Sequence, residues 1–376
     1  MEKRIIITEY FIDVETTKEY SGYFCSVWET LTIVILGSMC GLRNPKQIHQ
    51  WSTNERIREF LGKYFNITEI PCYYWLLCLL KLIEPKSLNR CFINWAKSLV
   101  GDRIAKLTLS FDGKTIRSTG KMGKYEQPLH IISAQIAELG LTFAQQTVEG
   151  KSNEIPAVRD LIEVLDIEGC MIVADALNCQ EKTAKAIVAG GADYLLNVKN
   201  NQKTLKKEIE DYVQDEELRS EMDTHSTIEK NSGRIERRTS YATCDIDWIF
   251  GKEKWAGLSC IGAVNTRFTT KDGTSNEWHY FISSRKLTAE ELLKHARLEW
   301  SVETMHWLLD VHFGEDFCRV EDENVQQILN IARKTALNSV KSFKLDTNST
   351  RPFSNIMLDC LLDPLYILNV LGISQN

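Results

Sequence analysis

Two short runs decide the fold: Leu107-Thr108-Leu109-Ser110-Phe111-Asp112 and Met171-Ile172-Val173-Ala174-Asp175. The first run alternates apolar and polar residues, which is typical of a β-strand with one buried face. The second is short and wholly apolar up to its aspartate, which is typical of a strand buried on both faces. We therefore expect both aspartates where a strand ends, a position at which α/β sheets commonly carry functional groups.

Further strands and helices follow in an order that predicts the fold class. Alternating or apolar runs predict strands, and apolar residues at helical spacing predict helices. The strands are expected at 130–138, 141–148 and 194–198, and the helices at 153–165 and 180–189. Three strands followed by alternating helices and strands is the order of a ribonuclease-H-like α/β fold, with a mixed five-stranded sheet and flanking helices. If the strands ending at Asp112 and Asp175 are the first and fourth, they are neighbours and their carboxylates converge.

The rest of the 376-residue chain is predicted to surround this core. Residues 1–100 carry only helical patterns, so we expect a helical N-terminal domain that either binds DNA or braces the second domain. The second domain is expected at 105–345, and a C-terminal segment at 346–376. A β-rich insertion is expected at about 214–286, before Glu303, with a solvated loop over 214–233 and strands at 234–243, 258–269 and 278–283.

A third carboxylate is expected on a helix. The sequence Thr288-Ala289-Glu290-Glu291 has the pattern of a capping box, and the helical pattern behind it runs through Glu303. A helix packed across the two strand ends would bring Glu303 to both aspartates. Phosphodiester cleavage uses two divalent ions about 4 Å apart, and Mg²⁺ prefers such oxygen ligands. The residues alone leave this open, because strand-end aspartates are also common turn residues.

Composition narrows the class of protein. The formal net charge of −6 is not that of a highly basic DNA binder, although a local basic groove would serve an enzyme. The eleven cysteines form no C-x-x-C pair, which argues against a zinc site or redox motif, and their odd number and the lack of a secretory signal favour reduced thiols in the cytoplasm. The most apolar stretches, 31–42 and 72–83, are too short to cross a bilayer, so no membrane partner is expected.

Several motifs, in one order, resemble the DDE transposases of the H-repeat-associated insertion-sequence type. The matching blocks are Asp112-Gly113-Lys114-Thr115-Ile116-Arg117, Lys151-Ser152-Asn153-Glu154-Ile155-Pro156, Asp175-Ala176-Leu177-Asn178-Cys179-Gln180, Gly191-Ala192-Asp193-Tyr194, Lys199-Asn200-Asn201-Gln202, Gly233-Arg234-Ile235-Glu236 and Trp300-Ser301-Val302-Glu303-Thr304-Met305-His306-Trp307-Leu308-Leu309-Asp310-Val311. The resemblance covers about residues 105–345 and, more loosely, the helical region before them. Many short motifs in one order are more specific than any single one.

The resemblance implies a metal-dependent DNA transposase. Asp112, Asp175 and Glu303 would be the catalytic residues and the ligands of two Mg²⁺ (or Mn²⁺) ions. The reaction would be strand cleavage at insertion-sequence ends followed by strand transfer. The implied partners are double-stranded DNA, as terminal repeats and as target, and a second copy in a homodimer on paired ends. The implied location is the bacterial cytoplasm, at the nucleoid.

Residues around this triad are candidate DNA contacts. They are Lys114, Arg117, Lys199, Gln202, Lys203, Arg234, Arg237 and His306. Amide and ammonium donors at the start of a helix suit a phosphate, which favours the group from Lys199 to Lys203. The bland interpretations are solvated charges for the basic residues and a structural histidine for His306. Glu154 is interpreted as an exposed helix charge, and Trp307 as packing between helix and sheet.

The chain departs from the family pattern at a few positions. Glu299 and Ser232 stand where the family usually has histidines. Related transposases carry a tyrosine, an arginine and a lysine around the catalytic glutamate, and here Ala296, Glu299 and Asp310 occupy about those positions. Two alternatives therefore stay open: a catalytically inactive, domesticated DNA-binding protein, and a ribonuclease-H-like nuclease without strand transfer.

Overall fold

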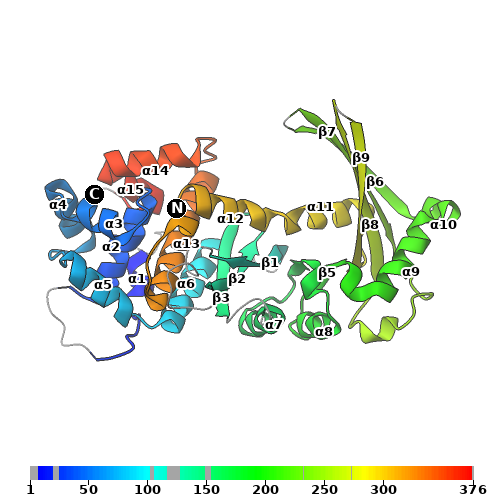
Figure 1. The fold of residues 1–376 in the computed structure, drawn as a ribbon, viewed down its shortest axis with the longest axis horizontal. Coiled ribbons are helices and arrows are strands. Elements are labelled where there is room, and N and C mark those ends of the chain that lie inside the picture. Colours follow the sequence, from blue (N-terminus) through cyan, green and yellow to red (C-terminus); the bar gives the residue numbers. More distant parts are fainter. Residues whose placement is uncertain are drawn as a thin grey trace.

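The computed structural model describes residues 7–19, 25–101, 106–116, 128–148, 154–231, 233–271 and 273–374. It is a mixed α/β structure, in which one large mixed sheet is flanked by helices and joined to a helical body at one end (Figure 1). The order of the nine strands is β3-β2-β1-β4-β5-β9-β8-β7-β6. Their bounds are β1 Thr108–Thr115, β2 His130–Ile136, β3 Leu141–Val148, β4 Met171–Ala174, β5 Asp193–Val198, β6 Asp223–Asn231, β7 Arg234–Thr243, β8 Cys260–Thr270 and β9 Gly273–Ser283.

The helical body combines both ends of the chain. Figure 1 shows the early helices beside the late ones, and the long α13 packs against α2, α5, α6 and α15. The helices of this body are α1 Ile7–Phe11, α2 Val27–Met39, α3 Pro45–Ser52, α4 Glu55–Phe65, α5 Tyr73–Leu82, α6 Pro85–Val100, α13 Glu323–Asp346, α14 Phe353–Leu362 and α15 Pro364–Leu371. Side-chain caps at Ser26, Asn44 and Asn54 begin three of them, as their residue types favour. No described helix has the length and apolar character needed to cross a membrane.

The β1–β4 pairing confirms that the strands carrying the two aspartates are neighbours. β1 and β4 run parallel, and their ladder ends at the pair Phe111 and Ala174. Asp112 and Asp175 follow directly, so both leave the ladder at the same edge of the sheet. The expectation that β1 ends at Asp112 is wrong, because β1 continues to Thr115 in an antiparallel ladder with β2.

The expected five-stranded sheet continues into four more strands. β9 pairs antiparallel with β5, and β8, β7 and β6 follow in order. The prediction of a loop over 214–233 is wrong, since this segment includes α10 (Glu216–Glu221) and β6. The loop was predicted because apolar residues are scarce there. The face of β6 that meets the neighbouring helix is held by polar contacts instead, including an ion pair of 2.6 Å between Glu229 and Arg297.

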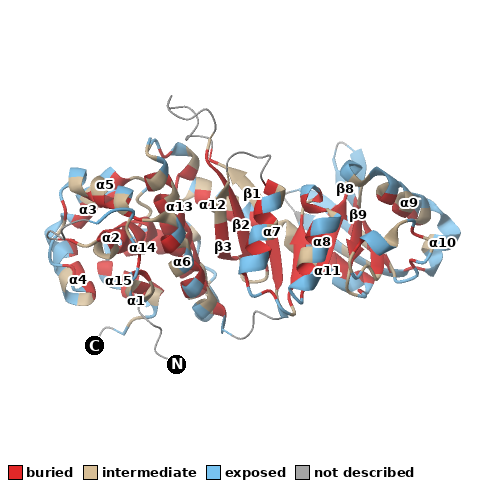
Figure 2. Cartoon of the chain, turned by 90° about the horizontal axis from the view of Figure 1, so that it is seen from below, coloured by how far each residue is buried: buried red, intermediate tan, exposed pale blue. Residues whose placement is uncertain are grey.

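Helices cover both faces of the sheet. α11 (Ala289–Glu299) and α12 (Ser301–Val311) follow one another across one face (Figure 1), and α11 starts at the predicted capping box of Thr288. The other face carries α7 (Glu154–Val164), α8 (Glu181–Ala189) and α9 (Lys203–Gln214). The single helix expected through Glu303 is interrupted at Trp300. Buried residues concentrate in the strands between these layers (Figure 2).

Candidate active site

Asp112 and Asp175 are held by local hydrogen bonds at the edge where β1 and β4 part. Asp175 caps the short helical turn Ala176–Asn178, and its Oδ1 accepts a hydrogen bond of 3.0 Å from Asn178 Nδ2. Asp112 Oδ2 lies 3.4 Å from His306 Nδ1 on α12. Each carboxylate thus has a fixed direction, and both remain on one edge.

Glu303 reaches this edge from α12, one turn before His306. Its side chain is exposed, and its negative charge is one of those that raise the pKa of Asp112. α11 and α12 are anchored over β1 by Ser110 Oγ, which donates to the carbonyl oxygen of Glu299 at 3.2 Å. Glu303 therefore lies on the helix beside Asp112, near enough for its charge to act on that carboxylate.

Two further carboxylates join them. The interpretation of Glu154 as an exposed charge is wrong: it is buried at the start of α7, and its Oε2 lies 3.2 Å from His130 Nε2. A Cβ atom at Gly113 would come within 2.9 Å of Glu154 Oε2, so glycine is what lets β1 and α7 approach there. Glu154 lies one turn before the buried Val158, and this helical phase was the signal that could have found it.

Glu299 is the second additional carboxylate. It ends α11, is hydrogen-bonded by Asn197 of β5, and carries a pKa raised to about 8 by burial and by the charge of Asp175. The departure from the family's histidine thus adds an acidic group next to the predicted triad.

The electrostatics of this edge disfavour negative charge. Burial raises the pKa of Asp112 from 3.8 to about 7, and the charges of Asp175, Glu154 and Glu303 add to the effect. Burial and Glu154 also raise the pKa of Asp175, although Asn178 and Lys199 oppose the rise. Like-charged carboxylates that share a site in this way stabilise one another's protonated forms or require a cation.

These donors fit a hard divalent cation. All are carboxylate oxygens, the ligands preferred by Mg²⁺ and Mn²⁺. Within the described ranges, no three histidine, cysteine, aspartate or glutamate side chains lie close enough to form a complete metal site by themselves. Mg²⁺ is commonly held by one or two carboxylates together with waters and substrate phosphates, so a protein-only cage is not required.

Lys114 belongs to a separate buried network behind the edge. Its Nζ lies 2.5 Å from Asp310 Oδ1 and 2.8 Å from Glu315 Oε2. Glu315 also accepts from Asn330 Nδ2 at 2.6 Å, and its pKa is lowered: burial alone would raise it, but Lys114 and nearby cations of α13 outweigh burial. The ammonium group of this candidate DNA contact is therefore engaged by two carboxylates and is largely buried.

His306 joins the edge to this network. Burial and the charges of Lys114 and Lys334 lower its pKa to about 3, so the imidazole is neutral at physiological pH. Its Nδ1 faces Asp112, and its Nε2 has no hydrogen-bond partner in the described part of the chain. The nearby Lys334 is fully buried and donates to Ser133 Oγ at 2.8 Å and Gln145 Oε1 at 2.7 Å.

The remaining candidate DNA contacts divide into engaged and exposed groups. Gln202 Nε2 donates to the carbonyl oxygen of Cys179 at 3.0 Å, which braces the loop after Asp175. Lys199 and Lys203 are exposed, and the charge of Lys199 is felt by Asp175. Arg117 lies outside the described residues, as does Ser232.

In the insertion, the side chain of Arg234 is engaged by neighbouring side chains, whereas that of Arg237 is exposed. Arg234 Nε lies 2.5 Å from Glu236 Oε1, and its guanidinium stacks 4.9 Å from the Phe268 ring centroid. Arg237 is exposed. Trp307 is 56% exposed, so the expectation that it packs between helix and sheet is wrong.

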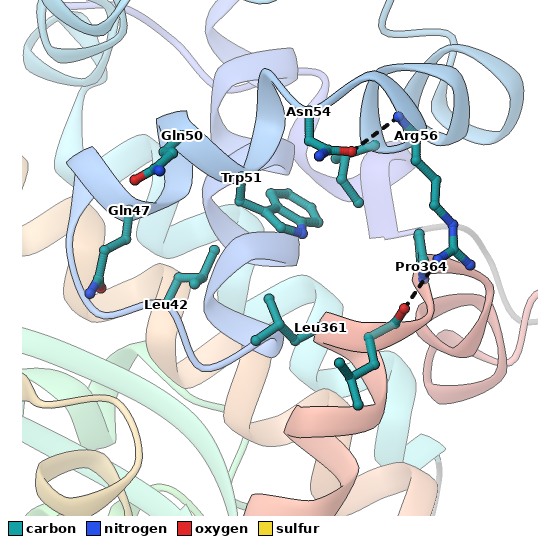
Figure 3. A pocket seen from close by; sticks show the side chains of 10 residues that line it. Leu42, Gln47, Gln50, Trp51, Asn54, Arg56, Leu361 and Pro364 are labelled. Atoms are coloured by element: carbon teal, nitrogen blue, oxygen red, sulfur yellow. Dashed lines mark hydrogen bonds between the residues drawn. The ribbon is translucent and has the colours of Figure 1, made fainter.

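A cavity in the helical body contains none of these residues. It has a volume of about 450 Å³ between α3–α4 and the C-terminal helices, and Trp51, Asn54 and Leu361 are among its lining residues (Figure 3). No carboxylate lines it, so the acidic edge of the sheet remains the candidate active site.

Comparison with known proteins identifies the family. The model described as "Transposase DDE domain" matches residues 105–339, and the one described as "DDE_Tnp_1-associated" matches residues 8–96. The chain is 32% identical over 356 residues to the Escherichia coli K12 protein named "H repeat-associated putative transposase YhhI", covering 92% of each chain. It is 31% identical over 354 residues to "Putative protein YbfL" of the same strain, covering 91% of each.

Among solved structures, a piggyBac transposase synaptic complex with hairpin DNA matches with a TM-score of 0.49 and 9% identity, over 97% of this chain and 77% of that one. That similarity is too distant to bear on fold or chemistry. The family match spans Asp112, Asp175 and Glu303. The chain therefore belongs to the DDE transposases of the H-repeat-associated insertion-sequence type, which are enzymes of DNA transposition.

Proposed function

We propose that Asp112, Asp175 and Glu303 are the catalytic carboxylates and bind two Mg²⁺ or Mn²⁺ ions within a ribonuclease-H-like core built on β1–β5. The observation that carries this proposal is the crowding of carboxylates at one edge, where burial and the charges of Asp175, Glu154 and Glu303 raise the pKa of Asp112 to about 7. The catalytic domain would span 105–345, with the helical domain at 1–100 and the C-terminal segment at 346–376.

The proposed reaction has two steps of in-line phosphoryl transfer. A water oxygen attacks the phosphorus at a transposon end, and the 3′-oxygen leaves with a proton as a free hydroxyl. That 3′-hydroxyl then attacks a target phosphodiester, forming one P–O bond as another breaks. When bound, the ions would activate the attacking oxygen and stabilise the leaving one.

The side chains around the triad would hold it in place. The Asn178 amide fixes Asp175, and neutral His306 faces Asp112 without adding a charge. Lys199 lies shortly before α9 and Lys203 is its first residue. Both are exposed and would contact phosphates of the bound duplex. We further propose that the enzyme works in the bacterial cytoplasm as a dimer on paired ends, and the eleven free cysteines suit a reducing compartment.

A cleavage and joining assay tests the proposal. Purified protein meets labelled DNA carrying the element's own ends, with Mg²⁺ or Mn²⁺, beside the Asp175→Asn variant. Metal-dependent nicking and joined products that vanish in the variant would support the proposal. Nicking without joined products would favour a nuclease, and binding without any cut would favour an inactive DNA-binding protein.

A further inference from the structure

Three neighbouring strands place a row of polar side chains under α11 and α12. The row before it has one residue on each strand and lies on the face that α11 covers: Ser110, Val173 and Leu195. Successive side chains of a strand alternate between the two faces of a sheet, so residues two positions on return to the same face. Those residues are Asp112, Asp175 and Asn197. Because neighbouring strands are about 4.8 Å apart, Asn197 stands one such spacing from Asp175.

Glu299 spans this row from above. Its carbonyl oxygen, at the end of α11, accepts a hydrogen bond of 3.2 Å from Ser110 Oγ, which places its backbone over β1. Its carboxylate is hydrogen-bonded by Asn197, which lies two strands away on β5. A side chain that reaches from β1 to β5 crosses β4, the strand that leads into Asp175. Burial has the largest influence on the pKa of Glu299, and the charge of Asp175 has the next largest. The two carboxylates are therefore close neighbours.

The carboxylate of Glu299 has no cation of its own within the described part of the chain. No described lysine, arginine or histidine lies within ion-pair distance of it, although the charge of Lys199 acts on it from farther away. Carboxylates that share a site repel one another, and removal from water adds to the cost of their charges. One amide donor from Asn197 does not neutralise that charge. The pair of Asp175 and Glu299 therefore requires a cation from outside the chain.

The amide group of Asn197 indicates that this cation carries water. The side chain is 2% exposed, and its Oδ1 has no hydrogen-bond partner among the described residues. The same amide group bonds Glu299, so the unpartnered oxygen lies beside that carboxylate. A buried acceptor without a donor is costly. Mg²⁺ keeps several of its waters when one or two carboxylates bind it, and those waters are hydrogen-bond donors.

We infer that Glu299 and Asp175 together hold one of the two divalent ions, with Asn197 beside them as an acceptor for the water of that ion. This inference rests on the proposed function, which brings two ions to this edge. Glu303 acts on Asp112 at the β1 end of the row, so the two glutamates serve different ends of it. Two carboxylates with waters satisfy Mg²⁺, which agrees with the absence of any group of three ligands from the described ranges.

The test is Mn²⁺ binding to the full chain without DNA, followed through the EPR signal of hydrated Mn²⁺, which disappears as the ion binds. Glu299→Gln keeps the size of the side chain and an acceptor for Asn197 but removes the charge. One of the two ions should then bind about 10-fold more weakly or worse, while the other changes by less than about twofold. The matched control is Glu290→Gln, because Glu290 is exposed on the first turn of the same helix and should not affect either ion.

Glu299→His supplies a measurement that a purely structural role does not change. Imidazole suits Ni²⁺, whereas carboxylates suit Mg²⁺. The variant should therefore lose affinity for Mg²⁺ and gain affinity for Ni²⁺, both measured by competition with Mn²⁺. An unchanged ratio of the two affinities means that residue 299 does not touch the ion, and it overturns the inference.

Asp175→Asn separates this inference from the proposed function. If that variant loses an ion while Glu299→Gln binds both as the wild type does, the inference is overturned and the catalytic proposal stands. A wild type that binds no Mn²⁺ also overturns the inference, and nicking by the wild type then decides the catalytic proposal. Loss of both ions in Glu299→Gln with a lower unfolding temperature shows a structural role and overturns it too. Loss of one ion, with an unchanged unfolding temperature and an unchanged control, supports it.

Discussion

Asp112 is a partly buried carboxylate and Glu315 a fully buried one, both beside His306, and their pKa values shift in opposite directions. The side chain of Glu315 is 1% exposed and that of Asp112 is 28% exposed, so burial alone would raise the pKa of Glu315 more. The pKa of Glu315 is nevertheless lowered, because Lys114, Lys334 and Arg333 surround it. The pKa of Asp112 is raised to about 7, because burial raises it and its charged neighbours Asp175, Glu154 and Glu303 add to the rise instead of opposing it.

The comparison separates carboxylates that the chain neutralises itself from carboxylates that need a cation from outside. Asp310 is intermediate, since burial and the charges of Asp316 and Glu315 raise its pKa despite its contact with Lys114. The same distinction applies to cations in the insertion. Arg238 is paired with two glutamates, whereas Arg237 faces another arginine. Under the proposed function, divalent ions and DNA phosphates would supply the charges that these two regions lack.

The largest effect is expected from Asp112→Asn. A metal ion is worth several kcal/mol of transition-state stabilisation, so losing one ligand should reduce metal-dependent nicking by about 10³-fold. Stability should not fall, because the substitution removes a buried carboxylate from a group of like charges. Nicking rates and thermal unfolding are measured on the same preparation. A variant that nicks at the wild-type rate would remove Asp112 from the catalytic group.

Lys114→Met tests the network around Glu315, whose negative charge the chain itself neutralises. It leaves Glu315 buried beside fewer cations, and breaking a buried ion pair by removing one partner costs about 3–5 kcal/mol. Urea unfolding measures the loss. The double variant Lys114→Met/Glu315→Gln should recover part of it, because the uncompensated charge is gone. If the single variant is as stable as the wild type, the network does not hold α12 and the segment behind it to β1.

The raised pKa values at the carboxylate edge should make the free energy of unfolding depend on pH. The pKa of Asp112 is raised from 3.8 to about 7 and that of Glu299 from 4.5 to about 8. The folded state therefore binds more protons than the unfolded state between these values. The stability contributed by these two groups is complete below about pH 4 and is lost as pH rises through about 7 to 8.

Divalent ions should reverse that loss. At a concentration of 100 times the dissociation constant, a ligand adds about 2.7 kcal/mol, and the gain should be larger at pH 8 than at pH 5, where the carboxylates hold protons. Thermal unfolding with and without Mg²⁺ at both pH values measures this difference. In Asp112→Asn the gain should shrink at pH 8; an equal gain in variant and wild type would place the ion elsewhere.

Much of the core was predictable because its strands obey simple patterns. The run 171–174 is buried on both faces, and the structure gives β4 those bounds. The convergence of Asp112 and Asp175 followed from the strand order alone. Glu154 and Glu299 were missed for a different reason: a carboxylate on a helix shows its burial only through the helical phase and through what the helix packs against.

The insertion was harder to predict, since polar contacts replace apolar ones there. β6 has few apolar residues, and its face toward α11 is held by Glu229 and by Asp223, which accepts from the backbone nitrogen of Ala289 at 2.7 Å. A search for apolar alternation cannot detect a strand of this kind. The ion pairs of Lys114 could not be predicted from the sequence either, because its partners Asp310 and Glu315 follow it by about two hundred residues.

The smallest effect is expected from a pair of substitutions on one strand. Arg237→Ser removes one of two arginines that face each other, so it should raise stability by about 0.2–1 kcal/mol. Arg234→Ser makes the same chemical change but removes an ion pair with Glu236 and a stacking contact with Phe268, so it should lower stability slightly. Opposite signs in urea unfolding would show that Arg237 is kept at a cost to the free protein, as expected for a residue that serves a ligand. If both variants lose stability, some group of this chain already balances the charge of Arg237.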